Sequence, residues 1–546
     1  MSPTRRAFLQ TGAVAAAGLW LPSLSRSRPR THHVAEFQPT WASLAQYETP
    51  DWFRDAKFGM WAHWGPQCVP EYGDWYARNM YIPGQRQYVA HLARYGHPSK
   101  SGFKDIIHQW RAEEWRPDDL VALYRDVGAQ YFMALANHHD NMDLWDSTHQ
   151  RWNSVRVGPK KDLIAGWARA TRRAGMRFGV SVHASRAWSW YEVAKGADKD
   201  GPMAGVPYDG KLARAQGKGQ WWDGLDPQDL YEQRHAPGRQ LEWDWDASKG
   251  SSIPDRAYCE RYFARTIELI DRYEPDLVYF DDHRLPLDPV SDVGLRIAAH
   301  FYNRNMQRHG GRLEAVLTGK VLNEAQRKCM VWDIERGVAN ELQPLPFQTD
   351  TCIGDWHYSR PVLARHGYKS AQFVAQMLVD IVSKNGNLML NIPLPGSGTP
   401  DDDELAFIAD FGRWMNANSR AIYASRPWAV FGEGPSTVAQ EPLRAQGFNE
   451  GRNKPYTSED LRFVQKDGKL YAFALAWPES GTLTIKSLAT GSPHTQGQVE
   501  RVELLGASTP LEHTRSADGL AIKLPERRPG DYVYTFEISG RGLVAG

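Results

Sequence analysis

Two adjacent carboxylates close an apolar run at residues 278–283, which read VYFDDH. Because side chains alternate across a strand, Asp281 and Asp282 point to opposite faces and do not form a two-carboxylate site by themselves. The inward one could serve as a nucleophile, a metal ligand or the partner of an arginine. A second carboxylate, Glu335, closes the run VWDIE and could transfer a proton or pair with a cation such as Arg336. An attacking carboxylate with a proton-transferring one is the pair that retaining glycoside hydrolysis uses.

Histidine dominates the other polar residues at predicted strand ends, which are His63, Asn137, His138, His139, Asp140, His183 and Lys320. Histidine beside a carboxylate suits zinc or iron. The chain has no HExxH motif, however, and the WAHWG run has one His where a barrel metallohydrolase has HxH. We therefore predict no metal and no cofactor. Neutral histidines with tryptophans are favoured as hydroxyl-binding groups, because an imidazole both donates and accepts hydrogen bonds.

The elements that must position these residues repeat one pattern. An amphipathic helix, a Gly or Pro stop and an apolar strand follow one another in residues 118–140, 161–185 and 256–283. Further apolar runs are found at residues 57–65, 312–320, 329–335 and 386–394. Continuous apolar strands are typical of parallel sheets buried on both faces.

Such alternation predicts an open doubly wound sheet or a closed (β/α)8 barrel. No GxGxxG follows the first strand, which disfavours a dinucleotide-binding open sheet. A barrel also brings all the polar strand ends to one face. The sequence therefore predicts a (β/α)8-like TIM barrel catalytic domain over residues 36–420.

Two regions depart from this pattern. Residues 191–253 are rich in Gly, Asp and Lys but contain Trp221, Trp222, Trp243 and Trp245, which predicts a wall or lid over the pocket. After residue 420, short runs alternate apolar and polar residues, and Asp467-Gly468 marks a tight hairpin. This texture predicts a C-terminal antiparallel β-sandwich over residues 425–546.

The N-terminus reads TRRAFLQTGAVAAAGLWLPSLS at residues 4–25, with Arg5 and Arg6 ahead of a short apolar run. This is typical of a twin-arginine export signal, so residues 1–30 are predicted to be a signal peptide. The run is too short to span a membrane comfortably. We expect a protein without a membrane span, located in the periplasm or secreted.

The amino-acid composition limits the kinds of partner that we expect the protein to bind. The formal net charge of +1 gives no field for a nucleic acid partner. The 22 Trp and 23 Tyr suit either a carbohydrate surface or a core with many large aromatics. The cysteines, Cys68, Cys259, Cys329 and Cys352, show no CxxC spacing, and we expect mostly free, buried thiols.

Eight short motifs occur in one order between about residues 40 and 420: AHWGP, DWYARNMY, NHHD, LWDS, WNSV, GPKKDLI, YEPDLVYFDD and DTCIGDWHY. Together they resemble glycoside hydrolase family 29, the retaining α-L-fucosidases. The resemblance implies a (β/α)8-like barrel followed by a β-sandwich. It also implies hydrolysis of terminal α-L-fucose from oligosaccharides or polysaccharides by double displacement, without a cofactor.

The resemblance also assigns residues. The nucleophile corresponds to Asp281. Fucose-binding positions correspond to His63, Trp75, His138, His139 and Trp356, and an aromatic position to Tyr279. Several positions differ from the usual residue: Asp74 replaces Glu, Asn137 replaces Lys, His183 replaces Tyr as a hydroxyl contact, and Lys320 stands for a basic residue on the next strand.

The acid/base is the least regular position. Many members carry a Glu where this chain has Gln348, and an amide cannot cycle a proton. The expected acid/base is therefore Glu335, with Glu341 second. The alternative is a catalytically impaired, lectin-like barrel that binds fucose.

Overall fold

The computed structural model describes residues 36–238, 245–438, 449–450 and 455–544. The predicted signal peptide at residues 1–30 lies outside these residues. No helix in the described part of the chain is long and apolar enough to cross a membrane. All four cysteines are free and buried, as expected.

Eight parallel strands close into a barrel in sequence order, and β1 pairs with both β2 and β8, which confirms the predicted TIM barrel. The strands are β1 (Phe58–Ala62), β2 (Tyr131–Asn137), β3 (Arg177–Val182), β4 (Leu277–His283), β5 (Val316–Lys320), β6 (Val331–Glu335), β7 (Phe347–Cys352) and β8 (Gly386–Asn391). Only β7 is absent from the predicted runs. Its sequence FQTDTC is polar because Gln348 and Asp350 lie in a hydrogen-bonded network inside the barrel.

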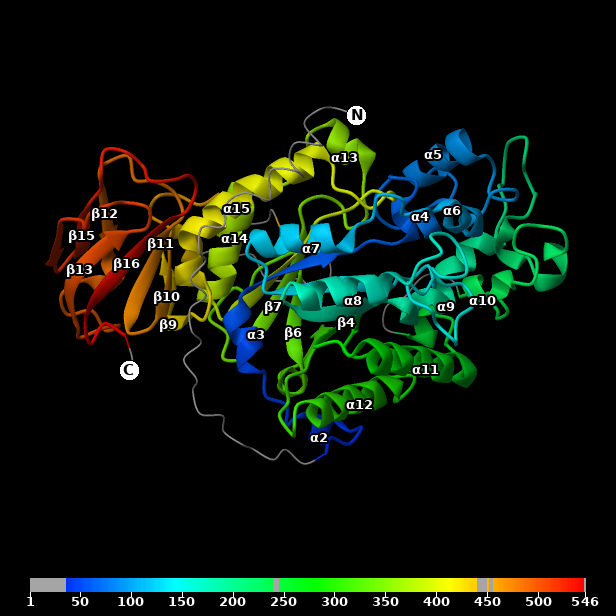
Figure 1. Cartoon of the computed structure of the whole chain (residues 1–546), viewed down its shortest axis with the longest axis horizontal. Helices are drawn as coiled ribbons and strands as arrows, with labels where there is room; N and C mark the ends of the chain where they lie inside the picture. Colours follow the sequence, from blue (N-terminus) through cyan, green and yellow to red (C-terminus); the bar gives the residue numbers. More distant parts are fainter. Residues whose placement is uncertain (1–35, 239–244, 439–448, 451–454, 545–546) are drawn as a thin grey trace.

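Helices cover the outside of the barrel (Figure 1). The helices that follow or precede strands are α7 (Pro117–Asp126), α8 (Leu163–Arg173), α11 (Arg256–Tyr273), α12 (Val293–Arg308), α14 (Ala371–Ser383) and α15 (Asp402–Ile422). The shorter ones are α2 (Trp41–Leu44), α3 (Asp51–Ala56), α4 (Tyr76–Asn79), α5 (Arg86–Tyr95), α6 (Phe103–Gln109), α9 (Ala187–Trp190), α10 (Pro227–Tyr231) and α13 (Arg360–Ala364). Local chemistry sets their ends: the carboxylates of Asp162 and Asp255 accept main-chain N–H groups at the starts of α8 and α11.

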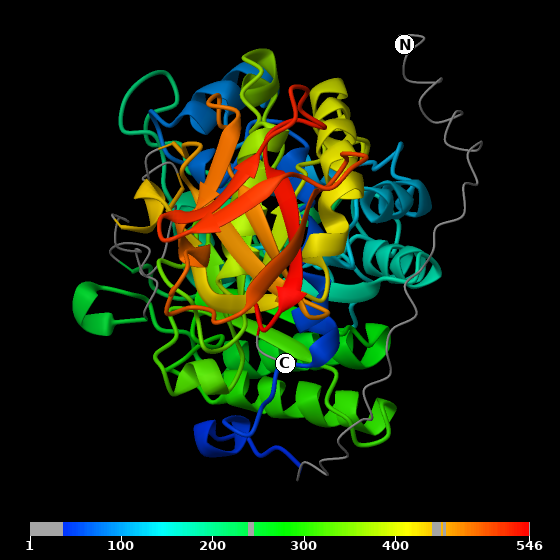
Figure 2. The same cartoon turned by 90° about the vertical axis from the view of Figure 1, so that its left-hand side faces the viewer.

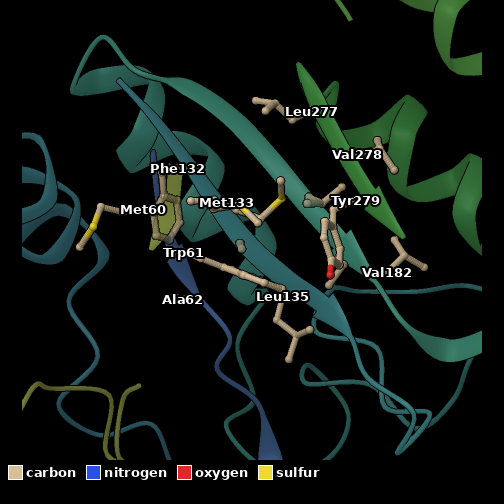
Figure 3. Close-up of a cluster of buried hydrophobic side chains, with 14 of the residues drawn as sticks. Met60, Trp61, Ala62, Phe132, Met133, Leu135, Val182, Leu277, Val278 and Tyr279 are labelled. Carbon is tan, nitrogen blue, oxygen red and sulfur yellow. The ribbon is translucent and has the colours of Figure 1, made fainter. Parts of the chain in front are cut away.

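The barrel interior is apolar on one side and polar on the other. Figure 3 shows buried side chains of β1 to β4, among them Trp61 and Tyr279, whose ring centroids are 5.0 Å apart. Across the interior, Tyr131 donates to Gln348 (3.0 Å), and Gln348 donates to Asp333 (2.8 Å). Burial raises the pKa of Asp333 well above its usual range, so this carboxyl holds a proton and needs no cation of its own.

The C-terminal part is a separate pair of antiparallel sheets. One has the order β13-β16-β11-β10-β9 and the other β12-β15-β14, and their inner faces share one hydrophobic cluster, which confirms the predicted sandwich. The strands are β9 (Arg426–Glu433), β10 (Leu461–Lys466), β11 (Lys469–Ala474), β12 (Thr482–Ile485), β13 (Gln498–Leu504), β14 (His513–Ser516), β15 (Gly519–Lys523) and β16 (Tyr534–Arg541). Asp467 and Gly468, with φ of 49° and 76°, form the predicted tight turn between β10 and β11.

The sandwich lies against one end of the barrel, over α14 and α15 (Figure 2). A buried ion cluster joins the two parts: Asp380 of α14 pairs with Lys384 (2.8 Å) and with Arg462 of β10 (2.5 Å). Burial alone would raise the pKa of Asp380, but the two cations hold it below its usual value. The carboxylate is therefore ionised, and each cation at this interface depends on it.

Replacing Asp380 with Asn should lower stability sharply, because Lys384 and Arg462 would be left buried beside a neutral amide. Breaking a buried pair of this kind costs about 3–5 kcal/mol. Urea unfolding followed by tryptophan fluorescence measures the effect. Glu503→Gln, which breaks the exposed pair with Arg501, is the control and should leave the midpoint unchanged. An Asp380→Asn midpoint equal to that of the wild type would contradict the assignment.

Candidate active site

A cavity of about 700 Å³ opens at the carboxyl ends of the barrel strands. Apart from the second acid/base candidate, Glu341, it brings together the residues that the sequence singled out for catalysis or binding: His63, Asp74, Trp75, His138, His139, His183, Tyr279, Asp281, Lys320, Glu335 and Trp356. The rest of its lining is Trp61, Asn79, Gln85, Arg86, Gln87, Asp350 and His357. The strand ends of a parallel barrel are where active sites of this architecture lie.

The two adjacent aspartates of β4 face opposite sides of the barrel wall. Asp281 points into the cavity, where its Oδ2 lies 3.2 Å from His183 Nδ1 and 3.3 Å from His139 Nε2. Asp282 points outward and pairs with Arg186 at 2.9 Å, and both of these side chains are buried. Ser185 donates a further hydrogen bond to Asp282. Asp281 is therefore available to a ligand, and Asp282 anchors the chain behind it.

One lysine links the two cavity carboxylates. Lys320 Nζ lies 2.9 Å from Asp281 Oδ1 and 3.1 Å from Glu335 Oε2. These oxygens are therefore at most about 6 Å apart, which is less than the ~6.5–9.5 Å that inverting hydrolases need to fit a water molecule. The spacing agrees with a retaining mechanism, in which one carboxylate reaches the sugar carbon directly.

The charges of Asp281 and Lys320 depend on each other. Burial alone would raise the pKa of Asp281, but Lys320 and hydrogen bonds from His139 and His183 hold it well below its usual range. Burial alone would lower the pKa of Lys320, but Asp281 and Glu335, followed by Asp350, hold it well above its usual range. An ionised Asp281 carries the electron pair that an attacking group needs.

Five imidazoles surround the cavity. Gln67 Nε2 donates to His138 Nδ1 (2.8 Å), so the proton of a neutral His138 sits on Nε2. Both ring nitrogens of His63 and of His357, and Nε2 of His183, are buried without a hydrogen-bond partner among the described residues. Buried polar atoms rarely stay unpaired in a native protein, so a bound ligand with several hydroxyls would complete them.

Three of these imidazoles, those of His63, His138 and His183, are neutral. Burial lowers the pKa of His63 and His138 well below the usual value and that of His183 to about 4. For His183 the hydrogen bond to Asp281 opposes the shift, and burial outweighs it. A neutral imidazole offers one donor and one acceptor, as a sugar hydroxyl requires.

Two sets of three side chains lie close enough to share a metal ion: His63, His138 and His183, and His139, His183 and Asp281. The second set includes a carboxylate that already has the ammonium of Lys320 2.9 Å away, which disfavours another cation there. Three neutral imidazoles are a donor set that zinc accepts, so the first set is the place where a metal would bind.

The outer wall of the cavity comes from residues 74–87. Trp75 adopts a left-handed backbone conformation (φ 61°), and its half-exposed ring packs on Trp190 with centroids 4.9 Å apart. Arg78 donates to the main-chain oxygen of Trp190 at 2.5 Å. Strained backbone held by its surroundings is typical of ligand-contacting residues.

Among the described residues of 191–253, none lines the cavity, so this part of the segment does not form the predicted wall or lid. It packs behind the wall instead, beside α4, α5 and α6 (Figure 1). Asp209 accepts hydrogen bonds from Tyr81 (2.7 Å) and Tyr231 (2.6 Å) there. Trp243 of this segment lies outside the described residues.

The three acid/base candidates lie in different places. Gln348 is fully buried in the barrel interior between Tyr131 and Asp333 and does not line the cavity, so it does not occupy an acid/base position. Glu341 is exposed in the loop after β6 and is likewise not part of the lining. Glu335 is in the lining and bonded to Lys320.

Several of the lining residues were not predicted from the sequence, although the positions of some of them in the sequence indicated that they face the cavity. Trp61 lies in β1 two residues before His63, which follows the end of the strand, and the continued alternation places both inward. His357 follows Trp356, and its main-chain N–H donates to Asp74 (2.8 Å). Asn79, Gln85, Arg86 and Gln87 come from a loop and helix whose position no periodicity reveals.

A closed parallel barrel with two carboxylates held by one lysine across a histidine-lined cavity defines a barrel glycoside hydrolase. Comparison with sequence profiles of known families shows which family of glycoside hydrolases this is. The profile described as alpha-L-fucosidase matches residues 25–420, and that of the alpha-L-fucosidase C-terminal domain matches residues 453–539. The chain therefore belongs to the α-L-fucosidase family, glycoside hydrolase family 29, as the motifs predicted.

Similar proteins cover nearly the whole chain. The tissue alpha-L-fucosidase of Macaca fascicularis is 25% identical over 96% of this chain and 97% of its own length. The plasma alpha-L-fucosidase of Homo sapiens is 24% identical over 91% and 90%. Among solved structures, the Thermotoga maritima alpha-fucosidase is 21% identical with a TM-score of 0.65, over 92% of this chain and 100% of that one. Isoenzyme 1 from Paenibacillus thiaminolyticus has a TM-score of 0.62 at 18% identity, over 91% and 100%.

The neutral imidazoles make stability depend on pH. Because the folded pKa of His183 is about 4, below the unfolded value of about 6.5, the unfolded chain binds more protons between these values. The free energy of unfolding should therefore fall as the pH drops from 6.5 to 4. His183→Asn should show a shallower slope, by up to about 1.4 kcal/mol per pH unit.

Urea unfolding between pH 4.5 and 7.5 measures these slopes. His366→Asn, which removes an exposed imidazole, is the control and should keep the slope of the wild type. A His183→Asn slope as steep as that of the wild type would show that His183 takes up its proton in the folded protein.

Proposed function

We propose that this protein is a retaining exo-α-L-fucosidase in which Asp281 is the nucleophile and Glu335 the acid/base. The observation that carries the proposal is the shared contact of both carboxylates with Lys320 in a cavity lined by histidines. The substrate class comes from the family. A Thermotoga maritima alpha-fucosidase structure holds fucose, and another holds a mechanism based inhibitor.

In the first step, an Asp281 oxygen attacks the anomeric carbon of the terminal fucose. The glycosidic bond breaks, and Glu335 gives its proton to the leaving oxygen. In the second step, Glu335 takes a proton from water, the water oxygen attacks the anomeric carbon, and the bond to Asp281 breaks. Two inversions at one carbon leave the released fucose with its original configuration.

The cavity suits a single terminal sugar. Its inner end is closed by Trp61 and Tyr279, and Tyr279 donates to Asp350 (2.7 Å). His63, His138, His139 and His183 offer nitrogens to the hydroxyls, with Asp74 at the wall. The rings of Trp75, Tyr279 and Trp356 supply apolar surface for the methyl group of fucose. The leaving group then extends past residues 79–87 toward solvent.

The lectin-like alternative loses its one support, because Gln348 lies in the barrel interior and two carboxylates remain in the cavity. Export to the periplasm or beyond the cell is part of the proposal. Its support is Arg5-Arg6 ahead of a short apolar run in the sequence.

Asp281→Gly should abolish hydrolysis of 4-nitrophenyl α-L-fucoside, because no group remains within reach to attack the sugar. Added azide should partly restore turnover and yield the β-configured fucosyl azide, since one displacement inverts the carbon. Asp282→Asn is the matched control one residue along β4, and it should keep the activity per folded molecule. Substantial hydrolysis by Asp281→Gly without azide would remove Asp281 from this role.

Wild-type assays with and without EDTA should agree, and a loss of activity with EDTA would indicate that the histidine set binds a metal.

Glu335→Ala should lower kcat/KM for an alkyl fucoside by about 10²–10⁴, because its leaving oxygen needs a proton. The 4-nitrophenyl substrate should lose far less, since its leaving group is stable as an anion. Azide should raise kcat and give the α-configured fucosyl azide, the product of two displacements. Glu341→Ala, outside the cavity, is the control and should behave as the wild type. Equal losses on both substrates, without azide rescue, would move the acid/base elsewhere.

A further inference from the structure

Two described residues of the connection between β9 and β10 of the sandwich, Asn449 and Glu450, lie at the ends of β6 and β7, next to Glu335. This contact is separate from the ion cluster of Asp380, which lies on α14. A segment of the C-terminal domain therefore touches the strand end that carries the proposed acid/base.

Asn449 packs on the main chain that follows Glu335. Its N–H donates to the carbonyl of Arg336 (2.7 Å), and its Nδ2 lies 3.4 Å from the carbonyl of Glu335. Gly337 makes the approach possible, because a Cβ at this position would be 2.5 Å from Cβ of Asn449. The close contact therefore depends on both residues, because Gly337 has no side chain and the Asn449 side chain packs against it.

Glu450 binds the side chains around the same strand ends. Its carboxylate pairs with Arg336 Nε (3.1 Å) and with Lys369 Nζ (2.5 Å) and accepts a hydrogen bond from Thr351 of β7. Its side chain is only 9% exposed. A buried carboxylate between two cations is an anchor whose neutral replacement would leave both of them poorly paired.

The residue held in this way has an unfavourable backbone. Arg336 has φ of 44°, which a non-glycine residue adopts only when its surroundings enforce it. Its N–H donates to the carbonyl of Asp350 (2.8 Å), its carbonyl accepts from Asn449, and its guanidinium binds Glu450. The guanidinium also lies 5.9 Å from the ring of Trp356, another cavity residue. The direction of Glu335 depends on this turn, since Glu335 is the last residue of β6.

We propose that Asn449 and Glu450 are positioning residues for Glu335, so that the C-terminal domain sets the geometry of proton transfer in the barrel. The inference rests on the proposed acid/base role of Glu335. Neither residue lines the cavity, so their effect on catalysis runs through the turn at Arg336 and Gly337. The requirement is strict, because a displacement of about 1 Å in a catalytic group can cost about a hundredfold in rate.

The test compares Glu450→Gln and Asn449→Ala in the full chain on two substrates. For an alkyl fucoside, kcat/KM should fall about ten- to a hundredfold, because the leaving oxygen depends on a well-placed proton. For 4-nitrophenyl α-L-fucoside it should fall less than about threefold, because this leaving group needs little assistance. Glu537→Gln is the matched control: Glu537 is a buried carboxylate of β16, paired with Lys469 and Arg420, and its loss should change both substrates equally or not at all.

Gly337→Ala is a second variant that keeps both positioning side chains. Its new methyl group displaces Asn449 and should therefore give the same selective loss on the alkyl fucoside. Equal losses on both substrates, or no loss on either, in the Glu450 and Gly337 variants would overturn the positioning role. Glu335→Ala, assayed in parallel, separates the two ideas. If Glu335→Ala loses more activity on the alkyl fucoside than on the 4-nitrophenyl substrate and the positioning variants do not, only the positioning role is wrong. If Glu335→Ala shows no such difference between the substrates, the acid/base assignment itself is wrong.

Discussion

The ammonium group of Lys320 is the interaction on which the cavity depends. Asp281 and Glu335 approach it directly, and Asp350 lies 4.0 Å from it. Carboxylates this close repel one another strongly in a medium from which water is excluded. A cation between them lets the nucleophile stay ionised while a second carboxyl group lies within reach of the same sugar. A flexible lysine supplies this charge as a point rather than as the planar fork of an arginine, so it can bond to both partners without matching their planes.

The barrel makes this arrangement possible because successive side chains along a strand point to opposite faces, so neighbouring charged residues are separated. On β4 the inward carboxylate belongs to the cavity, and the outward one belongs to Arg186. The polar network of Tyr131, Gln348 and Asp333 lies below the cavity, where most barrels of this kind are filled by branched apolar side chains. A proton shared in this network lets the interior carry oxygen atoms without adding net charge beneath Lys320.

The sequence predicted the barrel and the sandwich, because these follow from periodicity and strand ends. Strand ends and ordered motifs also selected residues that the structure brings into one cavity, with Glu341 the exception. The sequence did not predict β7, whose inward Gln348 and Asp350 break the apolar pattern that identifies a buried strand. The same strand misled the acid/base comparison, since a motif match cannot tell a position in the interior from one at the cavity. The described residues of 191–253 do not line the cavity as predicted, and contacts such as that of Asp209 with Tyr81 join segments that no local pattern relates. Likewise, nothing local indicates that Glu450 meets Arg336 across the fold.

The place of residues 191–253 bears on how a protein of this architecture diverges. Because the described residues of this segment pack behind the wall, as Asp209 does on Tyr81, and none of them lines the cavity, substitutions in them reach the leaving-group side through the wall. The segment also touches the end of the strand that carries His138 and His139: Tyr191 donates to the main-chain oxygen of Asp140 (3.2 Å), and Asn141 donates to that of Leu230 (3.0 Å). Inherited change in the outer segment can therefore retune which glycans are accepted only where it leaves these contacts, and with them the chemistry at the barrel axis, in place.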